Sequence, residues 1–575
     1  MRRSRPEAGA PLSKTRPPIL APMAGAANPE RPVPFPGLLS LVLFLPALGA
    51  LAVLAMPSVA GIRWTSLAVT TVTFVLSLGL WMGFDPGVST AAAPQMADFV
   101  QWLPGVDTTY HVGIDGLNLL LILLTTLLGP IVVLSSWTYI GKAHKGYYAL
   151  ILLLQTGVTG VFASFDLFLF YVFFELTLIP MVFIIGVWGG EDRTYAAIKF
   201  VLYTLVGSLL MLVGVLWLGF AAGEATGAAG GFTTDWYALA SYGVPLGQQA
   251  WLFGLFALAF MIKVPLFPLH TWLPDAHTQA PTGGSVVLAG VLLKMGTYGL
   301  LRFVIPFFPN ASQTWAMPIA ILAVIGIVYG ALVAFAQTDI KKLVAYSSVS
   351  HLGFVVLGLF AFDTVAVQGS LIQMVNHGLS TGALFLIIGM LVERRHTRAM
   401  ADYGGIAKAV PVLTFFMLFS VFASAGLPGL NGFVGEFMIL VGSFDSPTVG
   451  NPLLIAVATT GVIFAAVYLL YMVYRTFFGE ITDEENRTMT DLNGREIALL
   501  MPLVIGMVWL GMGPAPFLAR SEAAVQSVLA TAQAKAVATR AAEGSDVAVV
   551  VPVQWPMPVA TAPDAAPAAA GPRAR

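Results

Sequence analysis

The chain has 575 residues, of which 57% are hydrophobic and 10% are charged, and its net charge is −1. Globular proteins carry about 25% charged residues, and the mean hydropathy here is +0.84, so the composition indicates a polytopic membrane protein. The near-zero net charge gives no sign of a nucleic-acid partner. The sequence contains no cysteine, which excludes disulfides, thiolate metal sites and iron–sulfur ligation within this chain.

The two ends of the chain differ from its apolar interior. Residues 1–36 are polar and contain several Pro and Arg residues, and we expect a disordered N-terminal extension; a transit peptide is the alternative. The first apolar run, 37–56, exceeds the ~7–15 residues of a signal-peptide core, which predicts a retained helix. The tail, 519–575, predicts one weakly amphipathic helix over 520–542 and disorder elsewhere.

Between these ends lie fourteen apolar windows of membrane-spanning length: 37–56, 64–83, 116–138, 147–164, 166–188, 196–221, 249–273, 283–304, 316–336, 343–361, 365–391, 411–441, 452–474 and 497–518. Two windows are interrupted, one by KVPLFP at 263–268 and one by LPGLNG at 427–432. Proline removes a backbone donor, and broken backbone at membrane depth survives only where protein or a water cavity lines it. We therefore predict two broken helices beside a functional path, with ordinary proline kinks as the alternative.

The positive charges of the loops predict the orientation of the chain. If the loops after odd-numbered helices are cytoplasmic, they hold 13 Lys and Arg residues, Lys341 among them. The loops after even-numbered helices hold one, Arg302. Because cytoplasmic loops are enriched in Lys and Arg, both termini are predicted to face the outside.

Seven ionisable residues lie within the apolar windows, and each lies on a different window: Glu175, Lys199, Lys263, Lys294, His351, His377 and Glu436. A charge at the bilayer centre costs roughly 2.5–3.5 kcal/mol on insertion scales. One or two ion pairs are enough to hold a helix bundle together, so a row of seven residues indicates an ion or proton path. A structural network that only locks the helices together is the alternative interpretation.

Lysine, glutamate and histidine are suited to proton transfer inside a membrane. Burial disfavours the charged form of lysine and allows it to release a proton, so Glu175 is predicted to control the proton of Lys263. Lys294 is the next predicted carrier, one connection further along the chain. Glu436 follows the second helix break and is the predicted carrier on the exit side. Lys199 lies near the start of its helix, where it either joins the path or extends to the cytoplasmic interface.

The histidines allow two interpretations. His351 and His377 can relay protons because imidazole both donates and accepts; taken singly, each is more often a buried histidine with satisfied hydrogen bonds. His270, Asp275 and His277 lie in one short segment and suggest a metal site, but the prolines of that segment and the lack of a fourth ligand favour a rigid re-entrant turn. We predict no metal and no cofactor in this chain.

The polar residues above lie in five segments with a recognisable pattern. The segments are FYVFFELTLIPM at 170–181, KVPLFPLHTWLPDAHTQAPTGGSVVLAGVLLKMGTYGL at 263–300, KKLVAYSSVSHLGF at 341–354, NHGLSTGALFLIIGML at 376–391 and GLPGLNGFVGEFMIL at 426–440. Together they resemble the antiporter-like membrane subunits of proton-translocating NADH:quinone oxidoreductase, complex I. The resemblance covers roughly 37–518 and is most specific at 263–300.

This resemblance implies a fold of fourteen helices with two inverted five-helix repeats, here windows four to eight and nine to thirteen. Windows seven and twelve then correspond to the broken helices. The implied division of the chain is an N-terminal extension (1–36), helices 1–3 (37–146), the first repeat (147–304), the second repeat (316–474), helix 14 (497–518) and a C-terminal tail (519–575).

The resemblance also implies a role for each polar residue. Glu175 resembles the glutamate of helix five, Lys263 its lysine partner on helix seven, and Lys294 the central lysine of helix eight. The two relay histidines occupy the expected positions. Glu436 resembles the helix-twelve acid typical of subunit M, called subunit 4 in mitochondria, whereas the L and N subunits carry lysine there.

The implied function is proton translocation within the membrane arm of a respiratory NADH:quinone oxidoreductase. FMN, iron–sulfur clusters and quinone then belong to partner subunits, and the direct partners are other membrane-arm subunits, including two antiporter-like ones. The implied location is a bacterial inner membrane, with both termini periplasmic; the mitochondrial inner membrane is the alternative. A subunit of a multisubunit Na⁺/H⁺ antiporter and a structural membrane scaffold are the rival functions.

Overall fold

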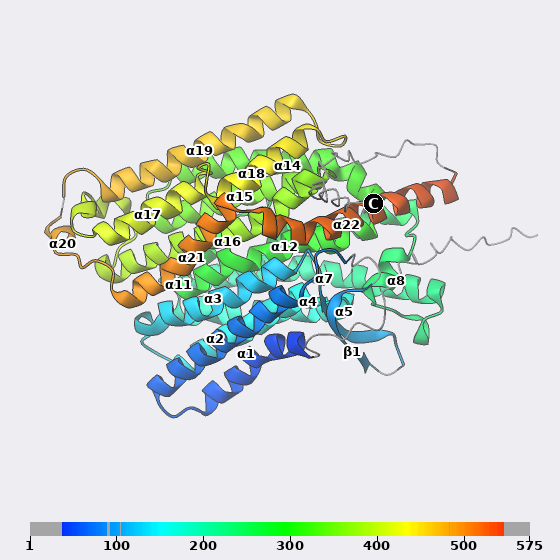
Figure 1. Cartoon of the computed structure of the whole chain (residues 1–575), viewed down its shortest axis with the longest axis horizontal. Helices are drawn as coiled ribbons and strands as arrows, with labels where there is room; N and C mark the ends of the chain where they lie inside the picture. Colours follow the sequence, from blue (N-terminus) through cyan, green and yellow to red (C-terminus); the bar gives the residue numbers. More distant parts are fainter. Residues whose placement is uncertain (1–36, 89–92, 104, 482, 545–575) are drawn as a thin grey trace, which may run out of the picture.

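The computed structural model describes residues 37–88, 93–103, 105–481 and 483–544. The predicted N-terminal extension, 1–36, and the end of the predicted tail, 545–575, lie outside the described residues. Within the described part, thirteen helices are long and apolar enough to cross a membrane. Figure 1 shows them running side by side, with α1 and α2 at one edge of the bundle and α19 at the opposite edge.

The thirteen candidate membrane spans are α1 (Leu38–Ala55), α2 (Val59–Gly83), α3 (Leu119–Tyr139), α4 (His144–Ala163), α5 (Leu167–Leu176) with α6 (Leu178–Trp188), α7 (Arg193–Thr226), α9 (Leu246–Lys263), α11 to α13 (Thr282–Phe307), α14 (Pro309–Phe335), α15 (Ile340–Leu359), α16 (Thr364–Arg395), α19 (Pro452–Phe477) and α21 (Gly494–Met512). The span Thr282–Phe307 is made of α11 (Thr282–Val287), the π-helical turn η2 (Leu288–Leu292), α12 (Leu293–Gly299), a second π-helical turn η3 (Leu300–Val304) and α13 (Ile305–Phe307).

The twelfth predicted window, 411–441, is divided into two short helices, α17 (Pro411–Ser424) and α18 (Asn431–Phe444). The break between them falls at the predicted LPGLNG sequence. The other predicted break is also present, because α9 ends at Lys263 and α10 (Trp272–Gln279) begins only at Trp272, after the segment that holds the prolines. The Trp272 indole N–H donates to the Ile262 carbonyl at 2.9 Å, which satisfies an oxygen left free at the end of α9.

The prediction of an all-α polytopic membrane protein of about 14 transmembrane helices with two broken helices is confirmed. The inverted five-helix repeats and the division of the chain stay predictions. One element was not predicted: β1 (Gln95–Leu103) and β2 (Thr108–Ile114) form an antiparallel hairpin between α2 and α3. Its sequence has no clean alternation of polar and apolar residues, so hydropathy alone gave no signal for strands.

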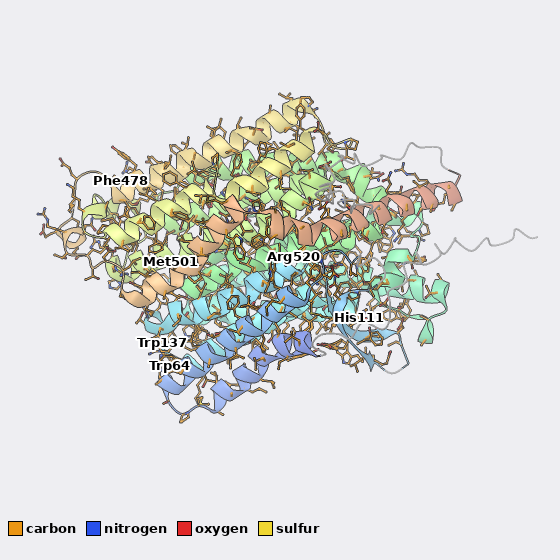
Figure 2. The ribbon with its side chains drawn as sticks, in the orientation of Figure 1. Trp64, His111, Trp137, Phe478, Met501 and Arg520 are labelled. Atoms are coloured by element: carbon orange, nitrogen blue, oxygen red, sulfur yellow. The ribbon has the colours of Figure 1, made fainter. Side chains whose placement is uncertain are left out.

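The C-terminal helix α22 (Ala515–Ala542) begins five residues before the helix predicted in the tail and ends at the same residue. The remaining short helices are α8 (Trp236–Ser241), α20 (Glu484–Arg487) and the 3₁₀ turns η1 (Ala229–Gly231), η4 (Met400–Asp402) and η5 (Ile406–Lys408). Figure 1 places the hairpin, α8 and α22 toward one end of the bundle and α20 at the other. Figure 2 agrees, with Trp64 and Trp137 near one end and His111 of the hairpin toward the other.

The core of the molecule lies in three spans at the centre of the bundle. The most apolar windows of Thr282–Phe307 and α16 are each 94% buried within the chain, and that of α15 is 89% buried, whereas the window of α2 is only 28% buried. Helices such as α2 expose apolar side chains that a membrane would cover. Three of the seven predicted residues, Lys294, His351 and His377, therefore lie on helices that other helices shield from lipid.

Candidate functional site

Lys294 lies at the centre of the most buried span. Its side chain is fully buried on α12, between the π-helical turns Leu288–Leu292 and Leu300–Val304. The ammonium donates to the carbonyl of Ala289, five residues earlier, and lies 2.6 Å from Nδ1 of His377 on α16. Single π-helical turns inside α-helices are frequent at functional sites. Here one such turn contributes the carbonyl that holds the lysine.

Glu436 forms a second polar group on α18, close to its start at the helix break. Its Oε1 lies 2.7 Å from Nδ1 of His351 on α15 and accepts a hydrogen bond from Nε2 of Gln373 on α16 at 3.0 Å. The other ring nitrogen of His351 lies 3.1 Å from the hydroxyl of Tyr468 on α19. Four helices thus position one carboxylate and one imidazole in a buried environment.

The two polar groups meet through their histidines. The ring centroids of His351 and His377 are 6.0 Å apart and the rings are inclined edge to face. Lys294, His377, His351 and Glu436 therefore form a row across four helices, and each residue is at most 2% exposed. Buried Nε2 of His377 and Oε2 of Glu436 have no partner among the described residues. Such unsatisfied atoms mark places where water or a moving proton can bind.

An asparagine pair closes the helix break beside Glu436. The Asn376 amide donates to the Asn431 carbonyl at 2.7 Å, and the Asn431 amide donates to the Asn376 carbonyl at 3.1 Å. Asn376 also donates to Oε1 of Gln373 at 3.2 Å. These bonds satisfy backbone and side-chain oxygens where α18 begins, so an interrupted helix is tolerated inside the bundle.

Glu175 and Lys263 lie near one another but do not form an ion pair. Glu175 is partly buried on α5, and Lys263, at the end of α9, is 1% exposed. The ammonium of Lys263 lies 5.0 Å from the ring centroid of Phe174 and 5.7 Å from that of Phe200. Glu175 acts on Lys263 through space. The cation is thus held against two aromatic rings, and its pairing with Glu175 stays a prediction.

The remaining predicted residues have separate partners. Lys199 on α7 forms an ion pair with Asp275 at 2.7 Å, and both side chains are partly exposed. The ring of His277 stacks on Phe385 at 4.6 Å. Within the described ranges, no group of three His, Asp or Glu side chains is arranged to hold a metal ion.

Two of the basic residues assigned to loops, Arg302 and Lys341, are instead buried inside the bundle. Arg302 lies in η3, is 1% exposed and forms an ion pair with Asp115 before α3. Lys341 lies in the first turn of α15, and its ammonium donates to the Ala280 carbonyl at 2.5 Å. Each side chain satisfies its donors inside the protein, which window averaging cannot foresee. Of the 13 basic residues counted after odd-numbered helices, nine lie within candidate membrane spans, near their ends: Arg63, Lys145, Arg193, Lys341, Lys342, Arg394, Arg395, Arg475 and Arg495. The excess of positive charge therefore belongs to helix ends and loops together, and the orientation stays a prediction.

Gln373, Asn376, Asn431 and Tyr468 are contact residues of the row that the sequence reasoning did not single out. The spacing of Gln373, Asn376 and His377 does provide a signal, because residues three and four apart share one helix face. Asn431 lies inside the predicted break and provides another. Tyr468 gives none, since tyrosine is common in membrane helices.

Comparison with known proteins shows the family of this chain. A sequence model described as "NADH:quinone oxidoreductase/Mrp antiporter, TM" matches residues 164–465. The "NADH-quinone oxidoreductase subunit M" of Rhodobacter capsulatus is 44% identical over 500 residues, which cover 83% of this chain and 93% of the relative.

Two solved structures share the fold. A chain of respiratory complex I from Thermus thermophilus with bound NADH aligns with a TM-score of 0.76 at 33% identity, covering 87% of this chain and 99% of that one. A chain of the Mrp complex from a Dietzia species aligns with a TM-score of 0.73 at 22% identity, covering 85% and 99%, and shows the fold alone.

The family match covers the helices that hold Lys294, His377, His351 and Glu436. Both the extent of that match and the identity to a nearly full-length relative agree with the family predicted from the sequence motifs. The chain therefore belongs to the NADH:quinone oxidoreductase/Mrp antiporter family of transmembrane proteins.

Proposed function

We propose that this chain is the M-type proton-translocating subunit of the membrane arm of a respiratory NADH:quinone oxidoreductase. The observation that carries the proposal is the buried row from Lys294 through His377 and His351 to Glu436. Three of its contacts bring together groups that exchange protons, and their helices lie at the centre of the bundle. A chain used only as a scaffold would gain nothing from unsatisfied buried atoms in this row.

Each residue of the row has a role that follows from its contacts. Lys294 holds a proton against the Ala289 carbonyl and passes it to Nδ1 of His377. Burial disfavours a charged ammonium, which assists the release. The two imidazoles carry the proton onward because each can donate through one nitrogen and accept through the other. Glu436 receives it from His351 beside the second helix break.

Glu175 and Lys263 control the row from the first helix break. A carboxylate near a buried ammonium favours its charged form, so neutralising or moving Glu175 would release a proton from Lys263. The span that contains Lys294 packs directly on this break: a Cβ added to Gly296 would lie 2.9 Å from the Val264 backbone nitrogen. The control thus acts at the contact between α9 and α12.

Redox chemistry belongs to partner subunits in this proposal. FMN, iron–sulfur clusters and quinone are bound elsewhere in the complex, and other membrane-arm subunits, two of them antiporter-like, surround this chain. The loop charges support a bacterial plasma membrane location with both termini on the periplasmic side. Co-purification of flavin- and cluster-bearing subunits with a tagged chain would support this assembly, and recovery with cation-antiporter subunits alone would overturn it.

The decisive experiment replaces Glu436 in the assembled complex. Glu436→Gln keeps the shape of the side chain but cannot exchange a proton, whereas Glu436→Asp retains the titrating group. We expect NADH-driven proton pumping in proteoliposomes to fall strongly in the Gln variant and less in the Asp variant. Glu224→Gln, an exposed residue at the far end of α7, is the control.

Assembly must be checked on native gels before pumping is compared. If Glu436→Gln pumps as well as the wild type in a fully assembled complex, Glu436 is structural and the proposed row does not conduct. If Asp is as impaired as Gln, position and not ionisation controls the step.

A further inference from the structure

A small cavity lies between the ends of four helices, away from the row. Its lining includes Ser135 of α3, Thr282 of α11, Glu393 of α16, and Arg495 and Glu496 of α21. About 10 Å³ of it is open to the centre of a water molecule, which is about the room that one water requires. Figure 2 marks this end of the bundle by Trp137, two residues beyond the serine on α3. The loops at this end carry the Lys and Arg residues and are predicted to be cytoplasmic.

The two acids of the cavity differ in how they are held. Arg394 donates two hydrogen bonds to Glu496, at 2.7 and 3.0 Å, and the backbone of Asn493 donates a third. Glu393 is only partly buried and forms no ion pair or hydrogen bond with the described residues. Its carboxylate is therefore free to bind and release a proton at the cavity.

The charged and titratable groups around Glu393 come from three helices. Arg394 is its neighbour on α16, Arg495 and Glu496 face it from α21, and Tyr139 faces it from α3. Two cations and one further acid thus surround a carboxylate that water can reach. Partial burial raises the pKa of this carboxyl, while Arg495 and Arg394 act in the opposite direction.

Polar groups continue from the cavity toward Lys294. The side chain of Thr282 packs against Gly389 of α16, where an added Cβ would lie 2.4 Å from the threonine hydroxyl oxygen, so the glycine leaves space for the hydroxyl at the cavity wall. One turn further, the Ser285 hydroxyl donates to the His277 carbonyl at 3.0 Å. The fully buried ring of His277 has no hydrogen-bond partner on either nitrogen among the described residues, and Lys294 acts on it electrostatically.

We propose that Glu393 is the proton-collecting group on the cytoplasmic side and supplies Lys294 through this cavity. The inference rests on the proposed function, since it needs a row that conducts. Glu393 takes a proton from bulk water and gives it to a water in the cavity beside Thr282. That water passes a proton along α11 toward His277 and Lys294. Each group that gives up a proton receives another from the preceding group on the path. Only O–H and N–H bonds form and break.

The test compares variants of the whole complex in proteoliposomes between pH 6 and pH 9. Glu393→Gln should lower NADH-driven pumping about 10-fold at the alkaline end, less than the 10²-fold or more typical of a positioned proton donor because water still reaches the cavity. The loss should be smaller at pH 6, where protons are abundant. Glu393→Asp should recover most of the rate. Glu191→Gln, an exposed acid in the loop before α7, is the matched control.

Thr282→Val is the second variant, because it keeps the shape of the side chain and removes the hydroxyl. It should also slow pumping with a larger loss at high pH, and it decides the outcome if Glu393→Gln fails to assemble. Pumping at the wild-type rate across the pH range, or an equal loss for Gln and Asp at every pH, would overturn the proposal. If Glu436→Gln abolishes pumping while Glu393→Gln does not alter it, the row conducts and protons are taken up elsewhere. If neither change matters, the proposed function itself fails.

Discussion

The hydrogen bond from Gln373 to Glu436 offers a direct test of how the row is tuned. Gln373→Met keeps the length of the side chain and removes the amide that donates to Oε1 of Glu436 at 3.0 Å. A hydrogen bond to a charged group contributes about 1.5–3 kcal/mol. Because each 1.36 kcal/mol changes an equilibrium tenfold, loss of this bond should weaken the binding of the Glu436 side chain within the row by about tenfold or more. The His351 contact stays in place.

Glu436 must ionise each time it passes on a proton, so this loss should slow pumping by about tenfold or more. The assay is NADH-driven acidification of proteoliposomes that contain the assembled complex, with quinone reduction measured in parallel. Gln368→Met is the matched control, because Gln368 lies on the same helix and donates instead to the Leu518 carbonyl at 3.5 Å. Equal pumping by the two variants at equal assembly would refute the assigned role of Gln373.

Two further predictions concern packing and the C-terminal helix. Gly296→Ala should lower both the melting temperature and the yield of assembled complex on native gels. The added Cβ would lie 2.6 Å from a backbone oxygen of α9, and overpacking costs about 1–3 kcal/mol. Gly254→Ala is the control and should change neither quantity, because nothing lies within 4 Å of the added Cβ. Burial lowers the pKa of Lys535 on α22 from 10.5 to about 7. Between these two pH values the lysine carries a proton when α22 is undocked and loses it when α22 is docked. The docked state should therefore become more stable as the pH rises from 7 to 9. Limited proteolysis should detect this change in the wild type and find none in Lys535→Met.

The sequence was sufficient to predict the membrane spans, both breaks and all four members of the buried row. Hydropathy averaged over a window reports whether a segment lies in the membrane, and proline and glycine report where it is interrupted. Ionisable residues are so costly in lipid that their presence alone indicates a buried path. Lys294 and Glu436 stood out for this reason without any knowledge of the fold.

The contacts within the row required the structure. Nothing in the spacing of Lys294 and His377, 83 residues apart, shows that the two side chains meet. The separation of Glu175 from Lys263 was equally hidden, since an acid and a base on neighbouring helices suggest direct pairing. Arg302 was misplaced for a related reason: its partner, Asp115, precedes it by 187 residues. Pairing between distant segments depends on how whole helices pack, and a local sequence pattern carries no information about that packing.

The two halves of the proposed path are joined by packing and not by a hydrogen bond. No described side chain bonds both Lys263 and the row, yet α12 approaches the turn after Lys263 closely enough that only glycine fits at position 296. Lys294 lies two residues before that glycine on the same helix. Electrostatic interactions inside a protein are weakly screened, and we propose that a change of charge at Lys263 reaches Lys294 across this contact. In the proposed function, the first helix break couples Glu175 to the row through backbone contact, and protons move along the row itself.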